Sequence, residues 1–213
     1  MSAPRHHPPP ELIVDYARGA IAPGPALVLA AHFGACAECR ASLRVAEAVG
    51  GALLAELEPA EMAPDALARA LASIERPAAH QPSPKPRADW IKVPAQVLVA
   101  AEQRKRWSAP GVWVAPVTHD PASGASSYLL RVGRGIAVPM HTHAGDELVC
   151  VVKGAYEDRG QTHGPGDFSL NDSTVQHEPR VTREGECVCL IATDHPLVPR
   201  SLTARLFQPF VRI

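Results

Sequence analysis

A short run of metal-ligating side chains restricts the fold of this chain more than any other part of its sequence. Two histidines alternate and a glutamate follows across a short turn, in the pattern Gly135-x5-His141-x-His143-x3-Glu147-x6-Gly154. Because successive side chains of a strand point to opposite faces, His141 and His143 share one face. The two glycines bracket the segment where the chain must turn tightly. The pattern predicts strands that carry ligands into the interior of a barrel.

A third histidine completes this set. His177 follows a Pro165-Gly166 turn and a short strand-like run. Three imidazoles and one carboxylate suit zinc, iron, nickel or manganese. We therefore expect zinc or another divalent metal here. The set is called the barrel site below, and its members are His141, His143, Glu147 and His177.

A second set of ligands lies far upstream, where His32, Cys36 and Cys39 follow one another at spacings of four and three residues. On one continuous helix these positions share a face. Three such ligands can take three corners of a tetrahedron, and sulfur-rich tetrahedral sites suit structural zinc. The fourth ligand comes from elsewhere, and His6 and His7 are both available. A zinc ion in this thiolate site would clamp two helices of a domain too small to be stable on its core alone.

A proline-rich segment separates two parts of the chain that differ in composition and in hydrophobic periodicity. Residues 1–76 are rich in Ala, Leu and Glu, whereas residues 77–89 carry four prolines among polar side chains. From residue 90 onward, short apolar runs are separated by turn residues at intervals of about ten residues. We predict two domains: an all-α helical zinc domain over 1–76 and an all-β barrel over 90–213. A stiff linker over 77–89 would join them and either carry coupling between them or only let them move.

Helical periodicity predicts about four helices in the first domain. The first begins near Pro10 and stops at Gly19. Residues 26–49 form one longer helix or two joined ones, which Gly50-Gly51 interrupts. The last covers residues 66–74, with its apolar side chains on one face.

The bulk composition excludes several classes of protein. The 21 basic and 22 acidic residues nearly cancel and no long basic run appears, so direct binding to nucleic acid is not favoured. The N-terminal segment is polar and lacks the apolar core of a signal peptide. The longest apolar stretch, residues 20–31, is broken by prolines and is too short to span a bilayer. We expect a cytoplasmic protein with no membrane partner. In that reducing compartment an odd number of cysteines, five, favours metal ligation over a disulfide framework.

Two further cysteines share one parity of a late strand. Cys187 and Cys189 are flanked by apolar residues. One interpretation is a pair of small buried residues. The other is a thiol pair near the metal that can be oxidised. Cys150 has the opposite strand parity to Glu147, which predicts that it packs outside the barrel.

The two halves resemble known families at these motifs. The barrel-site spacing resembles the first cupin motif, G-x5-H-x-H-x3-4-E-x6-G, at every defined position, and Gly164-Pro165-Gly166 resembles part of the second. Together the halves resemble the ChrR family of zinc-dependent anti-sigma factors over nearly the whole chain. The zinc anti-sigma pattern, an upstream histidine followed by H-x3-C-x2-C, falls on His7, His32, Cys36 and Cys39. The resemblance thus implies His7 as the fourth ligand of the thiolate site.

The resemblance also implies a function. Such proteins bind an ECF-type sigma factor through the helical domain and keep it from RNA polymerase. The cupin-like domain is needed for the response to oxidative stress, either singlet oxygen or organic peroxide. Candidates for the sigma-binding surface are apolar residues of amphipathic helices, each with plain domain core as its alternative: Leu12, Ile13, Leu67 and Leu71.

Two other functions compete with this one. A three-histidine, one-glutamate site would also serve a cupin metallo-oxygenase with an accessory zinc domain. That hypothesis leaves the thiolate site without a role, and no acid-base pair is visible beyond the ligands. A DNA-binding regulator would need a basic recognition helix, and residues 40–76 carry only four arginines against more acidic residues.

Overall fold

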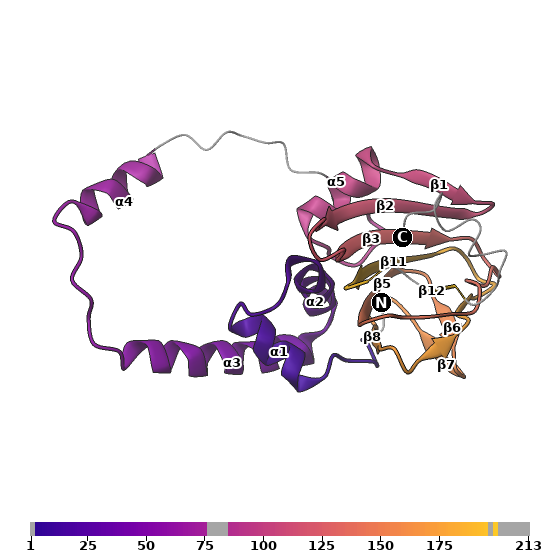
Figure 1. Ribbon diagram of the computed structural model, residues 1–213, viewed down its shortest axis with the longest axis horizontal. Coiled ribbons are helices and arrows are strands. Elements are labelled where there is room, and N and C mark those ends of the chain that lie inside the picture. The colour runs from indigo at the N-terminus through magenta and orange to yellow at the C-terminus, as the bar shows by residue number, and fades with distance from the viewer. Residues whose placement is uncertain (1–2, 76–84, 196–197, 200–213) are drawn as a thin grey trace.

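The computed structural model describes residues 3–75, 85–195 and 198–199 (Figure 1). Four helices lie before residue 76: α1 (Pro10–Ala17), α2 (Pro23–Ala35), α3 (Ala37–Ala55) and α4 (Ala66–Glu75). The predicted fold class is confirmed, because helices form the N-terminal half and a cupin-like set of strands forms the C-terminal half. A fifth helix, α5 (Ala95–Gln103), was not predicted, and it packs on β2 and β3.

The helix ends follow local chemistry. Proline occupies the first helical position of α1, where its fixed φ suits the helix and its missing N–H is not needed. After α1 the chain reaches Gly19 at φ +68°, a left-handed conformation that glycine adopts without strain. Helix α1 therefore ends at Ala17, two residues before the predicted stop at Gly19.

The predicted interruption at Gly50-Gly51 is wrong. Both glycines lie inside α3, and the break falls instead at Cys36, whose backbone is extended. The chain bends by 119° there, between α2 and α3. A glycine costs a helix only about 1 kcal/mol relative to alanine, which the surrounding alanines, leucines and valines tolerate. The Cys36 side chain accepts the Cys39 amide and so caps α3, and the extended backbone that this cap requires ends α2.

The strands form a six-stranded sheet with two small sheets opposite, and all pairs are antiparallel. The large sheet has the order β1 (Arg106–Ala109), β2 (Val112–His119), β3 (Ser126–Val132), β11 (Cys187–Thr193), β5 (Glu147–Lys153) and β8 (Phe168–Asn171). One small sheet has the order β10 (Arg180–Val181), β6 (Tyr156–Asp158) and β7 (Gln161–His163). The other has the order β12 (Val198–Pro199), β4 (His141–Thr142) and β9 (Gln176–His177).

Strands β5 and β11 are buried on both faces, and their two faces contribute to different cores. One face, with Val149, Val151 and Ile191, lines the inside of the barrel. The other face packs against α2. Cys150 belongs to this outer face, so the prediction that it packs outside the barrel is confirmed.

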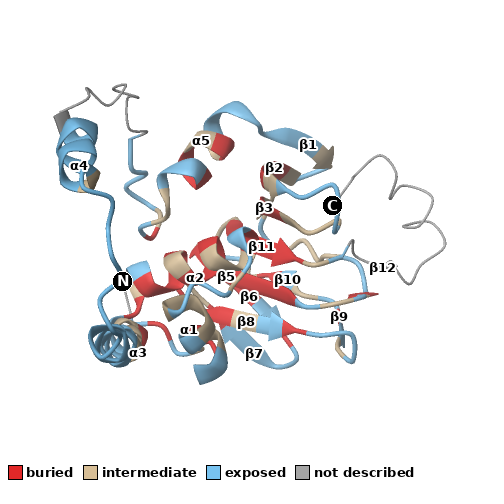
Figure 2. Ribbon diagram, turned by 60° about the vertical axis from the view of Figure 1, so that its left-hand side comes forward, coloured by how far each residue is buried: buried red, intermediate tan, exposed pale blue. Residues whose placement is uncertain are grey.

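Helix α2 is the contact between the two halves. Its Val28, Leu29 and Phe33 join a single core cluster with outward residues of β5, β8 and β11. Figure 2 shows the buried surface of α2 turned toward these strands, while α3 and α4 are largely exposed. Within the described residues, the helices have no core cluster of their own. The boundaries 1–76, 77–89 and 90–213 stay predictions, and residues 76–84 lie outside the described part of the chain.

No single helix of the described residues is long and apolar enough to cross a membrane, although α2 and α3, taken together as a bent pair, satisfy the criteria of length and composition.

Candidate metal centres

The four predicted ligands of the barrel site meet inside the barrel. One ligand atom from each of His141, His143, Glu147 and His177 lies within 4.8 Å of the others, and all four residues are buried. The Nε2 atom of His177 lies 3.1 Å from that of His143 and 3.0 Å from that of His141. Glu147 Oε2 lies 3.6 Å from His143 Nε2. Ligands about 2.1 Å from a tetrahedral ion stand roughly 3.4 Å apart, so this geometry fits a small divalent cation.

Three groups orient these ligands from outside. His177 Nδ1 donates to Asp158 Oδ2 at 2.9 Å, and His141 Nδ1 donates to the Pro139 carbonyl at 2.8 Å. Asn171 Nδ2 donates to Glu147 Oε2 at 3.1 Å. The two bonds to imidazole Nδ1 leave Nε2 of His141 and of His177 free for a metal and fix the planes of both rings. Asp158 and Asn171 were missed from the sequence, because no spacing relates them to the ligands they hold.

Burial controls the charges of the barrel site. Desolvation, followed by the neighbouring imidazoles, lowers the pKa of His143 to about 4. Burial also lowers the pKa of His141. It raises the pKa of Glu147 to about 7, against the opposing hydrogen bond from Asn171. The imidazoles of His141 and His143 are therefore neutral and ready to ligate at neutral pH, whereas Glu147 is about half protonated there and loses its remaining proton when it ligates.

This difference predicts a pH-dependent release of protons on metal binding. At pH 6 uptake of Zn²⁺ at the barrel site should release about one proton, and at pH 8.5 almost none, because the pKa of Glu147 lies near 7 in the metal-free fold. Calorimetry in buffers of different ionisation enthalpy measures this number. Glu147→Gln is the control and should lose the difference in proton release between the two pH values. Equal release at both pH values in the unmutated chain would contradict the assignment.

The same shift affects stability without metal. The folded chain holds the proton of Glu147 up to about pH 7, whereas the unfolded chain releases it near the ordinary value of 4.5. Because the folded state binds more protons in this window, the metal-free stability falls as pH rises from about 4.5 to 7.

The barrel site borders a cavity of about 60 Å³ that also reaches the late cysteines. Its wall includes His141, Glu147 and Tyr156 together with Cys187 and Cys189. The two thiols are buried, and their Sγ atoms lie 3.6 Å apart. The hydrogen bond to Cys187, together with burial, raises the pKa of Cys189 well above its ordinary value. The two residues are small and buried, as the first interpretation expects, and they border the same cavity as the predicted ligands. That the thiols can be oxidised stays a prediction.

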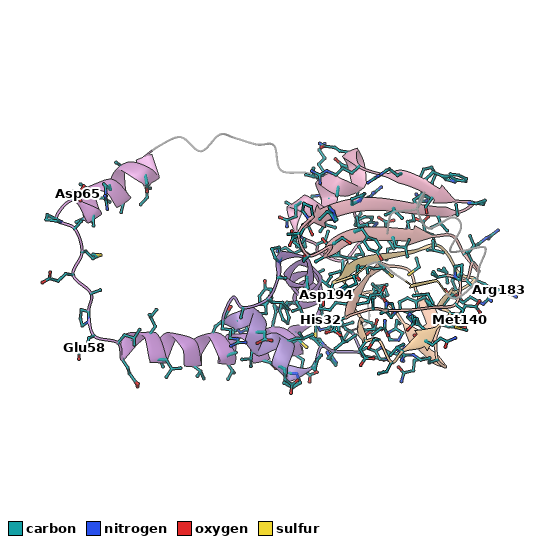
Figure 3. All side chains as sticks on the ribbon, in the orientation of Figure 1. His32, Glu58, Asp65, Met140, Arg183 and Asp194 are labelled. Carbon is teal, nitrogen blue, oxygen red and sulfur yellow. The ribbon has the colours of Figure 1, made fainter. Side chains whose placement is uncertain are left out.

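The thiolate site forms where three segments of chain meet. His7 Nδ1 lies 3.5 Å from Cys36 Sγ and 3.4 Å from Cys39 Sγ, and His32 joins the group with its ligand atom within 4.8 Å of the others. His32 Nδ1 donates to the Gly166 carbonyl at 2.7 Å, and its Nε2 is buried without a hydrogen-bond partner among the described residues. Figure 3 shows His32 where the helices meet the strands. Two nitrogens and two sulfurs fit tetrahedral zinc.

The structure distinguishes His7 from His6. The His6 ring packs against His163 with centroids 4.2 Å apart and the ring planes tilted by 32°, and its Nδ1 lies 3.3 Å from Asp167 Oδ2. His6 therefore belongs to the barrel surface, and His7 is the neighbour that reaches the thiols.

The expectation that His32, Cys36 and Cys39 share one helix face is wrong. They lie at the end of α2, at the break and in the first turn of α3. The Cys39 amide donates to Cys36 Sγ at 3.4 Å, so Cys36 caps α3. Helix N-termini favour thiolates. Without a metal, burial and the Cys36 hydrogen bond raise the pKa of Cys39 to about 12, so metal binding must displace its proton.

The four predicted partner-binding residues differ in exposure. Leu67 and Leu71 on α4 are 70% and 52% exposed. Leu12 packs against the core and Ile13 lies in it at 7% exposed, so Ile13 is not on the surface of this chain. Exposed apolar residues of α3 were missed, although their helical spacing was visible in the sequence: Val45, Val49, Leu53 and Leu54.

Comparison with known proteins identifies the family. Residues 95–196 match the model of the ChrR cupin-like domain. The anti-sigma-E factor ChrR of Cereibacter sphaeroides is 36% identical over 212 residues, which cover 98% of this chain and 99% of that protein. The chain belongs to the ChrR family.

One solved structure of the ChrR family matches this chain closely. The crystal structure of Rhodobacter sphaeroides SigE in complex with the anti-sigma ChrR aligns with a TM-score of 0.74 and 34% identity, covering 90% of this chain and 100% of that chain. A protein with a cupin-like fold from Ralstonia eutropha aligns more loosely, with a TM-score of 0.42, 18% identity, and coverage of 47% of this chain and 70% of that one. The resemblance to the ChrR family inferred from the two motifs is thus confirmed.

Proposed function

We propose that this protein is an anti-sigma factor that binds an ECF-type sigma factor through its helical half and keeps it from RNA polymerase. The observation that carries the proposal is the match over almost the whole chain to ChrR, which has been crystallised in complex with SigE. ChrR is a regulatory protein and not an enzyme. In this proposal the two ligand sets therefore serve structure and sensing, and neither catalyses a reaction.

An uncovered apolar surface supports this proposal. On α3, Val45, Val49 and Leu53 recur every fourth residue and are more than half exposed. On α4, Leu67, Leu71 and Ile74 repeat the pattern at 70%, 52% and 78% exposed. Within each helix, side chains at these spacings share one face, and such exposed apolar surface marks a protein interface. We call these six residues the apolar face.

In this proposal zinc in the thiolate site sets the direction of α3. His7 comes from the N-terminal segment, His32 from α2, and the two cysteines from the α2–α3 break. A tetrahedral ion bonded to all three segments would hold α3 at its bend and so present the apolar face to the sigma factor.

The sensing role belongs to the barrel site, which would hold zinc or another divalent metal. Cys187 and Cys189 border its cavity. A hydroperoxide would oxidise the two thiols to a disulfide and leave as an alcohol and water. Closing the present 3.6 Å gap to a bond of about 2.05 Å would shift β11 and favour a state that binds the sigma factor less tightly. We place the whole response, to singlet oxygen or organic peroxide, in the cytoplasm.

Co-expression with an ECF-type sigma factor of the same organism tests this function. We expect a one-to-one complex that carries zinc and inhibits transcription by the sigma-loaded polymerase. Treatment of the purified complex with organic hydroperoxide, or with light and a photosensitiser, should release the sigma factor. Failure to form any complex would overturn the anti-sigma function. A complex that forms but survives both oxidants would overturn the sensing role alone.

A further inference from the structure

The turn before β8 is in direct contact with the N-terminal segment that carries His7. Asp167 Oδ1 accepts the Arg5 amide at 2.6 Å and the His6 amide at 3.0 Å. The Phe168 amide in turn donates to the His6 carbonyl at 3.0 Å. The residues just before the first ligand of the thiolate site are therefore held by barrel backbone and by one barrel carboxylate.

Asp167 is a buried group whose second oxygen is also used. Its side chain is 4% exposed, and Oδ2 accepts the Gly164 amide at 2.7 Å and faces His6 Nδ1 at 3.3 Å. The His6 ring packs at a tilt against His163, which stacks on Tyr156 with centroids 4.8 Å apart. A buried carboxylate with this many donors fixes the backbone around it.

The same turn orients the second histidine of the thiolate site. The Gly166 carbonyl accepts His32 Nδ1 at 2.7 Å. Gly166 has φ +88°, and a Cβ there would lie 2.8 Å from both Ala35 Cβ and Pro4 Cγ. Only glycine allows the turn to approach the end of α2 so closely. Both histidines of the thiolate site are thus positioned by the barrel, whereas both cysteines are positioned by the α2–α3 break.

The far end of β8 is in contact with the other ligand set. Asn171, the last residue of this strand, donates to Glu147 Oε2 at 3.1 Å and accepts from Arg159 Nη2 at 3.0 Å. Between the two ends, β8 pairs with β5 from Phe168 opposite Cys150 to Asn171 opposite Glu147. A strand of four residues, about 13 Å long, therefore spans the supports of both sites.

We propose that the Gly164–Asp167 turn and β8 form a direct mechanical link between the two metal centres, in which Asp167 is a positioning residue for the His7 side of the thiolate site. The proposal rests on the metal-binding part of the proposed function. It assigns coupling between the halves to this contact, so that a change at Glu147 reaches His7 and His32 without passing through residues 77–89. Groups that hold metal ligands in place from outside are worth about 10–100-fold in metal affinity.

Asp167→Asn tests the support of the thiolate site. The amide keeps the shape of the carboxylate but turns an NH₂ group toward the Gly164 amide or the Arg5 and His6 amides. In the full-length chain loaded with Co²⁺, sulfur-to-cobalt absorption reports the thiolate site alone, because the barrel site has no sulfur ligand. We expect a competing chelator to remove this cobalt at about 10–100-fold lower concentration than from the unmutated chain. Asp172→Asn, at an exposed aspartate just beyond β8 that bonds only Thr174 and its neighbours, is the matched control and should behave as the unmutated chain.

Three outcomes decide the positioning role. Cobalt retention unchanged by Asp167→Asn would overturn it. So would equal losses of thermal stability in the metal-free and cobalt-loaded forms, because a merely structural residue stabilises both alike. A larger loss in the loaded form supports the role. An unmutated chain that shows no sulfur-to-cobalt absorption would instead overturn the metal-binding part of the proposed function.

Asn171→Ala tests the link itself. Asn171 contacts Glu147 and lies at the opposite end of β8 from the thiolate site. In the unmutated chain, filling the barrel site with Mn²⁺, which binds thiolate sites more weakly than Co²⁺ and does not displace it there, should raise the chelator resistance of cobalt in the thiolate site by about 5-fold or more, the usual lower range of coupling between sites. Asn171→Ala should remove most of this effect while both sites still bind metal. No effect in the unmutated chain, or an undiminished effect in the variant, would overturn the link.

Discussion

Cys36→Ser is expected to release the metal from the thiolate site and to abolish binding of the sigma factor in the same step. Cys36 is both a predicted ligand and the cap of α3, and its Sγ lies 3.5 Å from His7 Nδ1. Serine is a poor zinc ligand, and a structural zinc site contributes about 10–16 kcal/mol of apparent binding free energy in small zinc domains. That exceeds the margin of most folded domains, so the α2–α3 bend should be lost. Metal analysis and co-purification with the sigma factor measure both effects.

A second buried thiol provides the control. Cys150→Ser changes a cysteine that is 0% exposed, in the core shared by the helices and the barrel, but outside both ligand sets. It should keep zinc and keep the sigma factor, with at most a modest loss of stability. A zinc-free Cys36→Ser protein that still bound the sigma factor would show that the metal does not set the direction of α3.

Charge on the apolar face is expected to have the other large effect. Val49→Glu together with Leu53→Glu places two carboxylates where an apolar interface should form, and each buried unpaired charge costs several kcal/mol. We expect sigma affinity to fall by at least about 100-fold, which corresponds to roughly 3 kcal/mol. Metal content and thermal stability should not change, because both side chains are exposed in the free chain.

Gly51→Glu is the matched control for this change. It adds a carboxylate to the same helix on the opposite face, at a position with no atom within 4 Å of the new Cβ. Binding measured by titration should stay close to that of the unmutated chain. If Gly51→Glu weakened binding as much as the double substitution, overall charge and not the apolar face would be responsible.

The ligands could be predicted because each set is encoded over short distances. The spacings around His141 and Glu147, and around His32 and Cys39, depend only on the geometry of a few consecutive residues. The break at Cys36 could not be predicted in this way. A C-x-x-C pattern is compatible with one helix face, and only the sulfur cap on the Cys39 amide showed that α3 begins there.

The groups that hold the ligands had no local signal at all. Asp167 meets Arg5 and His6 across more than 160 residues, and Asn171 meets Glu147 across 24. Nothing in the residues beside Asp167 distinguishes it from a turn aspartate at the surface. The burial of Ile13 and the exposure of Val49 also depend on which faces the neighbouring elements cover, and that depends on the whole packing.

The sequence by itself determined the two ligand sets, the helical and barrel halves, and the family to which they point, because these follow from residue chemistry at short spacing. Only the tertiary structure decided that α2 packs into the barrel's outer core, that the barrel turn positions both histidines of the thiolate site, and that β8 reaches from one site to the other. The physical reason is that such contacts join residues far apart in the chain, and their existence depends on how the sheet and helices pack against each other.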